Sequence, residues 1–449
     1  MPQPTDLLTL LASGPVPAAA LVERLSISRP TLSRLIAAAG SRVIRYGAAR
    51  ATAYAAPRSI AGHANWPIYR IDERGASQRI ATLHAVGGGY LAELTEEGRH
   101  EFSEALPWWL QDMRPQGFLG RAFARGHALA LALPENLGLW NDDHSLIAIT
   151  ALGDDTPGNL LVGDTALAHY LGSAHAPAIA LDERVTRYPA LAAAALAGEA
   201  PGSSAGGEQP KFSAVLDEGL QQRAVLVKFS SAMQNPISQR WASLLVAEHH
   251  ALQTLHAAGY PASRSELLQA NGQTFLQVER FDRLASTDED SRLGRRGVVS
   301  LAALDDAFVG QAAQPWPLIT AQLAAQGRIT PESHRLAERL FAFGLMIGNT
   351  DMHRGNLAFL HTGGILDLAP AYDMLPMHYA PRASGEMNDT PPEIRFRNPP
   401  ALEAWREMLP LAHQWAASVA ADSRIDEALR SAISRQAQSL AGLAGTLLL

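Results

Sequence analysis

The sequence predicts an α+β fold in three parts: an N-terminal winged helix-turn-helix module, a β-rich small lobe and a helical large lobe. Three observations support this prediction. Apolar residues near the N-terminus repeat at helical spacing. From about residue 66, short alternating segments separated by polar turns predict strands. Beyond residue 400 the apolar spacing is again helical. We place the parts at residues 1–57, 58–282 and 283–449, since 449 residues suffice for about three domains.

The composition excludes several classes of function. Hydrophobic residues make up 47% of the chain and charged residues 18%, as in folded soluble proteins. No apolar run reaches the roughly 18 residues that span a membrane, and the N-terminus lacks the basic region of a signal peptide. We therefore expect a cytoplasmic protein without membrane contact. The chain has no cysteine, which excludes disulfides, Cys-ligated zinc and thiol catalysis.

Positive charge is concentrated at the N-terminus. Residues 1–57 carry a balance of +4, whereas the whole chain has a net charge of −7, so the remainder carries −11. A basic module on an acidic body indicates that the module meets a polyanion. Within it, the apolar spacing predicts three helices, at 5–13, 18–25 and 29–39, the last capped by Ser28.

A two-stranded wing around Gly47 is expected to follow these helices. The order is similar to winged helix-turn-helix domains of bacterial regulators, in which one helix enters the major groove. We therefore predict DNA binding through residues 1–57, and nucleoid association in the DNA-bound state. The candidate contacts are Arg29, Thr31, Ser33, Arg34, Arg42, Arg45 and Arg50. The alternative is a small helical module whose arginines are solvated or contact another protein.

The middle of the chain predicts a sheet. IYRI, RIATLHAV and GYLAEL alternate in polarity and are separated by polar turns. The stretch LIAITALGDDTPGNLLVGD, residues 146–164, predicts two more strands joined by a turn at GDDTPG. In that turn we interpret Asp154 and Asp155 as turn-formers rather than ligands.

The clearest functional signal lies in FGLMIGNTDMHRGNLAFL, residues 343–360. Asp351 and Asn356 show the D-x-x-x-x-N spacing of protein-kinase catalytic loops, where the Asp orients the attacking hydroxyl and the Asn reaches Mg²⁺. Asp373 follows a short apolar strand and a Pro-containing turn, where kinases place a second metal-binding Asp. Asp367, on that strand, is the structural alternative.

Only two of the 37 basic residues are lysines, Lys211 and Lys228. Lys228 lies in the apolar strand RAVLVKFSS, where a Lys is costly unless it is paired. Kinases use such a Lys to hold the α- and β-phosphates, with a Glu from the next helix as its partner, and Glu248 is the candidate here. The alternative is a strand-end Lys that reaches solvent. Lys211 follows the Gly-rich stretch SSAGGEQP, which can bring N–H groups near phosphates.

These elements occur in the order of a two-lobed kinase. Over about residues 66–440 the chain resembles the HipA family of bacterial serine/threonine kinases, known as toxins of toxin–antitoxin pairs. The resemblance rests on the motifs GGEQPKF, LVKFSS, VERFDR, GNTDMHRGN and LAPAYDML. The attached N-terminal helix-turn-helix makes the chain most similar to the YjjJ-like branch. The resemblance implies a protein-kinase-like body that uses ATP and Mg²⁺.

The resemblance also implies residue roles. Asp351 would be the catalytic base with His353 beside it, although loop packing is an equal alternative for His353; Asn356 and Asp373 would bind Mg²⁺. Ser204 would be the autophosphorylation site, with Ser203 as its neighbour. The ATP-binding set would be Gly206, Gly207, Gln209, Lys211, Lys228, Glu248, Glu279 and Phe281.

One position departs from the family pattern D-x-H-x-K-N. Gly355 stands where Lys is expected, and Arg354 is the nearest residue that could supply the charge. This departure raises a second hypothesis, a DNA-bound transcription regulator whose kinase body is inactive or only senses ATP. A third is a metal-dependent enzyme that acts on nucleic acid. For the kinase, the family implies a protein substrate from the translation machinery, such as an aminoacyl-tRNA synthetase, and a possible antitoxin partner.

Overall fold

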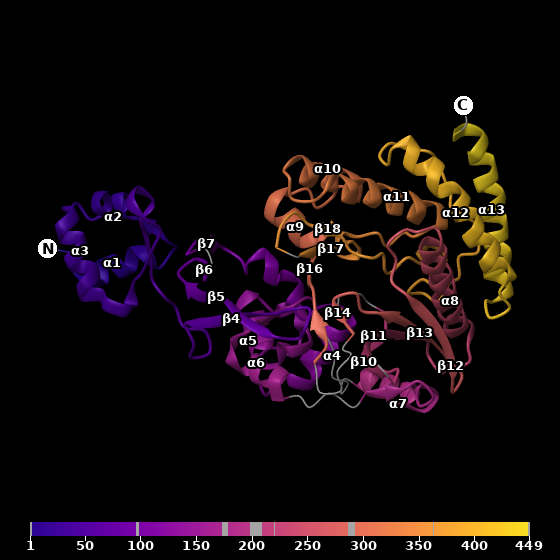
Figure 1. Ribbon diagram of the computed structural model, residues 1–449, viewed down its shortest axis with the longest axis horizontal. Helices are drawn as coiled ribbons and strands as arrows, with labels where there is room; N and C mark the ends of the chain where they lie inside the picture. The colour runs from indigo at the N-terminus through magenta and orange to yellow at the C-terminus, as the bar shows by residue number, and fades with distance from the viewer. Residues whose placement is uncertain are drawn as a thin grey trace.

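The computed structural model describes residues 2–95, 98–172, 178–197, 209–219, 221–285, 292–361 and 363–447. The N-terminal module lies at one end of the molecule and the C-terminal helices lie at the other, with two sheet-containing parts between them (Figure 1). No helix in these described ranges combines the length and apolar character needed to cross a bilayer.

The N-terminal module contains three helices and a small sheet. The helices are α1 (Pro4–Leu11), α2 (Ala18–Arg24) and α3 (Arg29–Ala39). The sheet has the order β1-β3-β2, with strands β1 (Val16–Pro17), β2 (Ile44–Tyr46) and β3 (Ala53–Ala55). Ser28 caps α3 by accepting a hydrogen bond from Thr31 N–H at 3.4 Å, as the sequence predicts. The helices pack through leucines, among them Leu7, Leu21 and Leu32.

The module contacts the middle of the chain directly. A Cβ at Gly87 would overlap the carbonyl oxygens of Leu11 and Ala12 at the end of α1, so this turn requires glycine. The ring of Tyr46, on β2, lies 5.7 Å from the ring of His100. Strand β2 therefore packs against the neighbouring sheet, which fixes the module on the body.

The middle part holds a five-stranded sheet of order β7-β6-β5-β4-β8. Its strands are β4 (Asn65–Ile71), β5 (Ser77–Val86), β6 (Gly89–Leu94), β7 (His100–Ser103) and β8 (Leu160–Val162). The short η3 (Trp108–Met113) follows the sheet, and η4 (Leu137–Leu139) and η5 (Gly153–Asp155) lie among its helices. These helices are α4 (Gly117–His127), α5 (Asp142–Leu152) and α6 (Gly163–Gly172).

One predicted strand is wrong. Residues 146–152 belong to helix α5, which starts at the N-cap Asn141. The Asn141 side chain accepts from His144 N–H at 3.0 Å, and Leu146 and Ile149 pack against the first sheet. A short apolar run does not distinguish a buried strand from a buried helix, so only the capping residues could have indicated the helix.

A second five-stranded sheet has the order β12-β13-β11-β10-β9 and its own core. Its strands are β9 (Ile179–Ala180), β10 (Lys211–Asp217), β11 (Gln222–Phe229), β12 (Ser265–Ala270) and β13 (Gln273–Glu279). Helices α7 (Arg184–Ala197) and α8 (Pro236–Ala257) pack on this part of the chain. Strands β10 and β11 are antiparallel, and their register places Lys211 opposite Lys228.

The C-terminal part is mainly helical and contains the largest core. Its helices are α9 (Leu301–Phe308), α10 (Trp316–Ala325), α11 (Pro331–Ile347), α12 (Leu402–Ala421) and α13 (Glu427–Leu447). The short elements are η6 (Arg354–Asn356), η7 (Met377–Tyr379) and strands β14 (Arg283–Leu284), β15 (Gly294–Arg295), β16 (Gly297–Ser300), β17 (Ala358–His361) and β18 (Asp367–Leu368). The D-x-x-x-x-N loop lies between α11 and β17, at the border with the second sheet.

Candidate active site

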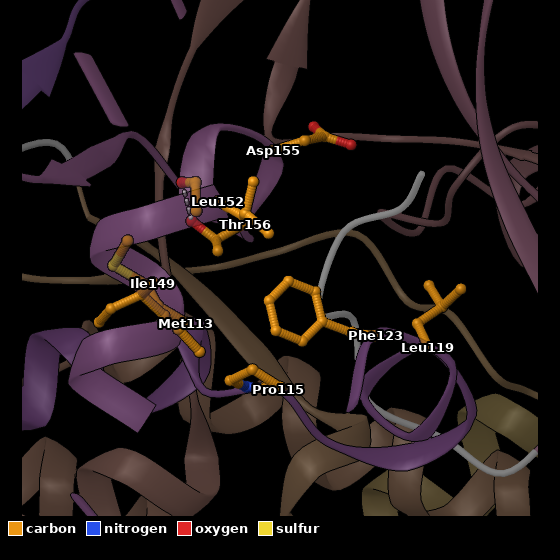
Figure 2. Close-up of a pocket in the computed structure, with 10 residues that line it drawn as sticks. Met113, Pro115, Leu119, Phe123, Ile149, Leu152, Asp155 and Thr156 are labelled. Carbon is orange, nitrogen blue, oxygen red and sulfur yellow. Dashed lines mark hydrogen bonds between the residues drawn. The ribbon is translucent and has the colours of Figure 1, made fainter. Parts of the chain in front are cut away.

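A cavity of about 840 Å³ lies where the second sheet, α8 and the loop after α11 meet. This volume falls within the range of about 300–1,000 Å³ that is typical of ligand pockets. A second hollow, between α4 and α5, measures only about 20 Å³ and has the ring of Phe123 in its centre (Figure 2). It holds no more than about one water molecule. The large cavity is therefore the candidate site.

A buried ion pair occupies one wall of the cavity. Lys228 Nζ lies 2.6 Å from Glu248 Oε1 and 2.8 Å from Oε2, and it also contacts Asp373 Oδ1. The side chains of Lys228 and Glu248 are 3% and 0% exposed, so the solvent-reaching alternative for Lys228 is wrong. Burial alone would lower the pKa of Lys228, but the two carboxylates outweigh it and raise that pKa.

The two carboxylates of this cluster differ in their environments. Burial raises the pKa of Glu248, although Lys228 opposes the shift. Burial acts in the same direction on Asp373, but Lys228 and then Lys211 outweigh it and lower the pKa of Asp373. Asp373 therefore remains an anion at neutral pH and can serve as a ligand for a cation. Its φ of 52° lies in the left-handed region, which is uncommon for a non-glycine residue and frequent at functional sites.

The catalytic-loop candidates are held by backbone and amide contacts. Asn356 Nδ2 donates to the Asp351 carbonyl at 2.8 Å, so the predicted pair lies together. Asn349 links both acidic segments: its Oδ1 accepts from Asp351 N–H at 3.0 Å, and its Nδ2 donates to the Asp373 carbonyl at 3.2 Å. Sequence reasoning missed Asn349, and its place two residues before Asp351 was the only signal that could have revealed it.

The loop residues around Gly355 form a tight turn. His353 Nδ1 accepts from Gly355 N–H at 3.0 Å, and a Cβ on Gly355 would lie 2.9 Å from His353 Cε1. A larger residue at 355 would thus displace the imidazole. Arg354 Nη1 lies 2.5 Å from carboxylate oxygens of Asp305 and Asp306, on α9. Arg354 does not line the cavity, so it does not supply the charge that a Lys at 355 would bring.

The cavity contains oxygen donors that suit Mg²⁺. The amide nitrogen of Asn356 is bound to Asp351, which leaves the amide oxygen as its acceptor, and Asp373 adds a carboxylate. Mg²⁺ is commonly bound by one or two such protein oxygens together with substrate phosphates. Among the described residues no group of three or more His, Asp or Glu side chains forms a ready-made metal cluster. The Asn356 amide oxygen and the Asp373 carboxylate therefore fit the protein's share of such a Mg²⁺ site.

The structure describes only some of the remaining residues that are predicted to contact the nucleotide. Lys211, 2% exposed, and Gln209 line the cavity, and Gln209 Nε2 is buried without a hydrogen-bond partner in the described parts of the chain. Glu279 and Phe281 also line it, and Glu279 N–H already donates to the Arg264 carbonyl at 2.9 Å. The predicted residues Gly206, Gly207, Ser203 and Ser204 lie outside the described residues.

Asp155 does more than form a turn. Its Oδ1 accepts from Arg280 at 2.8 Å and from Arg283 at 3.1 Å, which joins η5 to the segment after β13. Asp282 completes the cluster by accepting from both arginines. Burial would raise the pKa of Asp155, but Arg280 and Arg283 outweigh it and lower that pKa. Asp155 thus forms ion pairs across the fold, which its interpretation as a turn-former did not include.

The predicted DNA contacts lie on the surface of the N-terminal module. Thr31 is half-buried, and the structure describes no side chain for Arg50. The predicted contacts with exposed side chains are Arg29, Ser33, Arg34, Arg42 and Arg45.

Comparisons with known proteins identify the family. The YjjJ-like toxin middle domain matches residues 62–171, and the HipA-like C-terminal domain matches residues 203–440. The chain therefore belongs to the HipA-like toxin family. Within that family it is 40% identical over 428 residues to Toxin YjjJ of Escherichia coli (strain K12), which covers 95% of each chain. The predicted family and its YjjJ-like branch are thus confirmed.

Two solved structures are also similar. HipA of Shewanella oneidensis MR-1, in a complex with HipB and its operator DNA, matches with a TM-score of 0.49 and 15% identity; the match covers 83% of this chain and 96% of that one. The Helicobacter pylori proinflammatory kinase CtkA matches with a TM-score of 0.36 and 13% identity, over 53% of this chain and 89% of that one.

Proposed function

We propose that this protein is an ATP- and Mg²⁺-dependent serine/threonine protein kinase of the HipA toxin family. The observation that carries the proposal is the convergence of the Lys228–Glu248 pair, Asp373 and the Asp351–Asn356 loop on one cavity of about 840 Å³. Phosphoryl transfer needs little covalent chemistry from the protein and depends on positioned charges, which this convergence supplies.

Each group has a distinct role in the proposed reaction. Lys228, held by Glu248, would contact phosphate oxygens of the nucleotide. Asp351 would orient the acceptor hydroxyl and take its proton, since a carboxylate within hydrogen-bond reach can act as a general base. Asn356 and Asp373 would hold Mg²⁺, which neutralises charge on the phosphates when it is bound. His353 and Gly355 shape the loop between these residues.

We propose that the acceptor is a Ser or Thr of another protein, such as a component of the translation machinery. We also propose that the chain phosphorylates itself, at Ser203 or Ser204. The test is incubation of the pure chain with γ-labelled ATP, Mg²⁺ and cell lysate. Asp351→Ala should abolish the label on the chain and on lysate proteins. Asp367→Ala is the matched control, because Asp367 is an exposed carboxylate that does not line the cavity. Label that is equal in Asp351→Ala and wild type would defeat the proposal.

A second candidate function is DNA binding by the N-terminal module. The exposed side chains of Arg29 and Arg34 on α3, with Arg42 and Arg45 near the wing, favour it. Arg354 pairs with Asp305 and Asp306 and does not replace the Lys expected at position 355. This observation and the exposed arginines favour the hypothesis of a DNA-bound regulator. A mobility-shift assay of the full chain with genomic fragments tests it, and we expect binding that weakens steeply as salt rises. Retention of the same affinity across salt concentrations would contradict an arginine–phosphate interface.

A further inference from the structure

The catalytic loop, residues 349–356, and the metal-binding segment, residues 372–374, are separate stretches of backbone in the candidate site. The loop precedes β17 and the segment follows β18, and these two strands are paired. Ala369 N–H still donates to a carbonyl at the start of β17, at 2.9 Å. Ala371 N–H donates instead to the Pro261 carbonyl, also at 2.9 Å. Beyond Ala369 the backbone therefore pairs with the residues that lead into β12.

Asn349 links the two stretches at one end of the loop. Its Nδ2 donates to the Asp373 carbonyl at 3.2 Å, while its Oδ1 accepts from Asp351 N–H at 3.0 Å. Asn349 is 3% exposed, and its own N–H donates to the Gly344 carbonyl at 2.8 Å, which holds it at the end of α11. An amide side chain offers a donor and an acceptor at the same time, and both are used here.

Tyr372 links the same two stretches at the other end of the loop. Its hydroxyl donates to the Gly355 carbonyl at 2.8 Å, and its ring lies 5.7 Å from the ring of Phe281. Burial raises the pKa of the phenol, so the hydroxyl keeps its proton and remains a donor. Between the two links, Asn356 Nδ2 donates to the Asp351 carbonyl at 2.8 Å and closes the loop.

The backbone at Asp373 needs support from its surroundings. Its φ of 52° lies in the left-handed region, which costs a non-glycine residue free energy and persists where neighbouring contacts hold it. Tyr372 precedes Asp373 in the chain, and Asn349 binds the Asp373 carbonyl. Phosphoryl transfer depends on an acceptor hydroxyl and a metal held at a fixed separation. The two hydrogen bonds are placed to fix the separation of Asp351 from Asp373.

We infer that Tyr372 and Asn349 are positioning residues that hold the catalytic loop against the metal-binding segment. In the proposed reaction Asp351 acts on the hydroxyl and Asp373 on the metal, and the two hydrogen bonds keep these carboxylates at one separation. The inference rests on the proposed function. It gives a role to two residues that lie in the motifs GNTDMHRGN and LAPAYDML without a predicted function.

The test measures phosphotransfer and ATP binding separately in the full-length chain. Tyr372→Phe removes one hydroxyl and keeps the ring, so the variant should fold. Its labelling rate at saturating ATP and Mg²⁺ should fall about 10- to 100-fold, the loss expected when reacting groups are misplaced. Its dissociation constant for ATP, measured by calorimetry, should stay within about threefold of wild type, because the substitution leaves Lys228 and Glu248 in place.

Asn349→Asp tests the other link. The aspartate can still accept from Asp351 N–H, but as an anion it cannot donate to the Asp373 carbonyl. The labelling rate should fall by a similar factor at saturating ATP and Mg²⁺. In the double variant the loss should be about that of the more impaired single variant, since contacts that act as a unit are not additive.

Tyr188→Phe is the matched control. Tyr188 is also buried, and its hydroxyl donates to Gln277 Oε1 at 2.6 Å, but it does not line the cavity. This variant also loses one buried hydrogen bond and should keep the wild-type labelling rate. Tyr372→Phe and Tyr188→Phe should melt at similar temperatures, and only Tyr372→Phe should label slowly.

The outcomes separate the inference from the proposed function. A labelling rate within about twofold of wild type in Tyr372→Phe overturns the inference alone. Weaker ATP binding with an unchanged rate at saturation also overturns it, since Tyr372 would then bind the nucleotide. Losses that multiply in the double variant contradict a joint role of the two residues. Wild type that binds ATP but labels no protein overturns the proposed function, and the inference with it.

Discussion

Replacement of Lys228 by Met tests the buried charge cluster on which the site depends. Met has a similar length and no charge. Lys228 is 3% exposed and Glu248 is 0% exposed, and their charged atoms lie 2.6 Å apart. Removal of one partner from such a pair leaves a buried charge without its counterion, which costs about 3–5 kcal/mol. We expect Lys228→Met to lose that amount of stability at neutral pH.

The pH dependence of this loss has a defined sign. Burial already raises the pKa of Glu248, and loss of Lys228 raises it further. A carboxyl whose folded pKa exceeds its unfolded value destabilises the fold above the unfolded pKa, and the penalty shrinks as pH falls below the folded pKa. The deficit of Lys228→Met should therefore be smaller at about pH 5 than at about pH 7.5. The double variant Lys228→Met/Glu248→Gln should recover about 1–3 kcal/mol of stability relative to Lys228→Met, because it removes one of the two carboxylates that lost their counterion.

Hydrogen–deuterium exchange of β11 and α8 measures this local stability within the multidomain chain. Arg382→Met is the matched control, since Arg382 and its partner Glu386 are each 62% exposed and such pairs contribute at most about 1 kcal/mol. Wild-type protection of β11 in Lys228→Met at neutral pH would refute the reasoning. Loss of protection that does not diminish at lower pH would refute the carboxylate explanation.

Three further predictions follow from the same geometry. Lys228→Arg keeps the charge but should lose most phosphotransfer in the labelled-ATP assay, because a planar guanidinium does not fit the ammonium site; near-wild-type activity would contradict this. Arg29→Ala and Arg34→Ala should each weaken DNA binding and reduce the salt slope by about one in mobility shifts, whereas unchanged slopes would exclude phosphate contacts. Asp155→Asn should lower the stability of the full chain by about 1–3 kcal/mol, visible as a lower melting temperature, and an unchanged melting temperature would count against that cluster.

Part of the site could be predicted because its chemistry requires particular residues at short spacings in the sequence. A lone Lys in an apolar strand demands a partner, and the structure brings Lys228 and Glu248 together. The five-residue spacing of Asp351 and Asn356 fits a loop that closes on itself, and their contact at 2.8 Å is such a closure. In both cases the sequence pattern is short-range, and a physical requirement, charge pairing or loop closure, explains it.

Other features depend on tertiary contacts that no local pattern encodes. The segment 146–152 is apolar enough for a strand, but it forms α5, which starts at the Asn141 cap and packs on the first sheet. Asp155 resembles an ordinary turn residue until Arg280 and Arg283, more than a hundred residues later, are placed beside it. Asp112 lines the cavity from η3, outside every kinase motif of the sequence, and its neighbour Trp108 packs against Phe308 of α9.

The most direct test of phosphotransfer is a quantitative comparison of phosphorylated sites in a lysate treated with ATP, Mg²⁺ and either wild type or Asp351→Asn. The substitution keeps the size of the side chain and removes its basicity. We predict new phosphoserine or phosphothreonine sites, on the chain itself or on other proteins, that appear with wild type and are absent with the variant. Identical sets of sites in the two samples would contradict the assignment of a kinase.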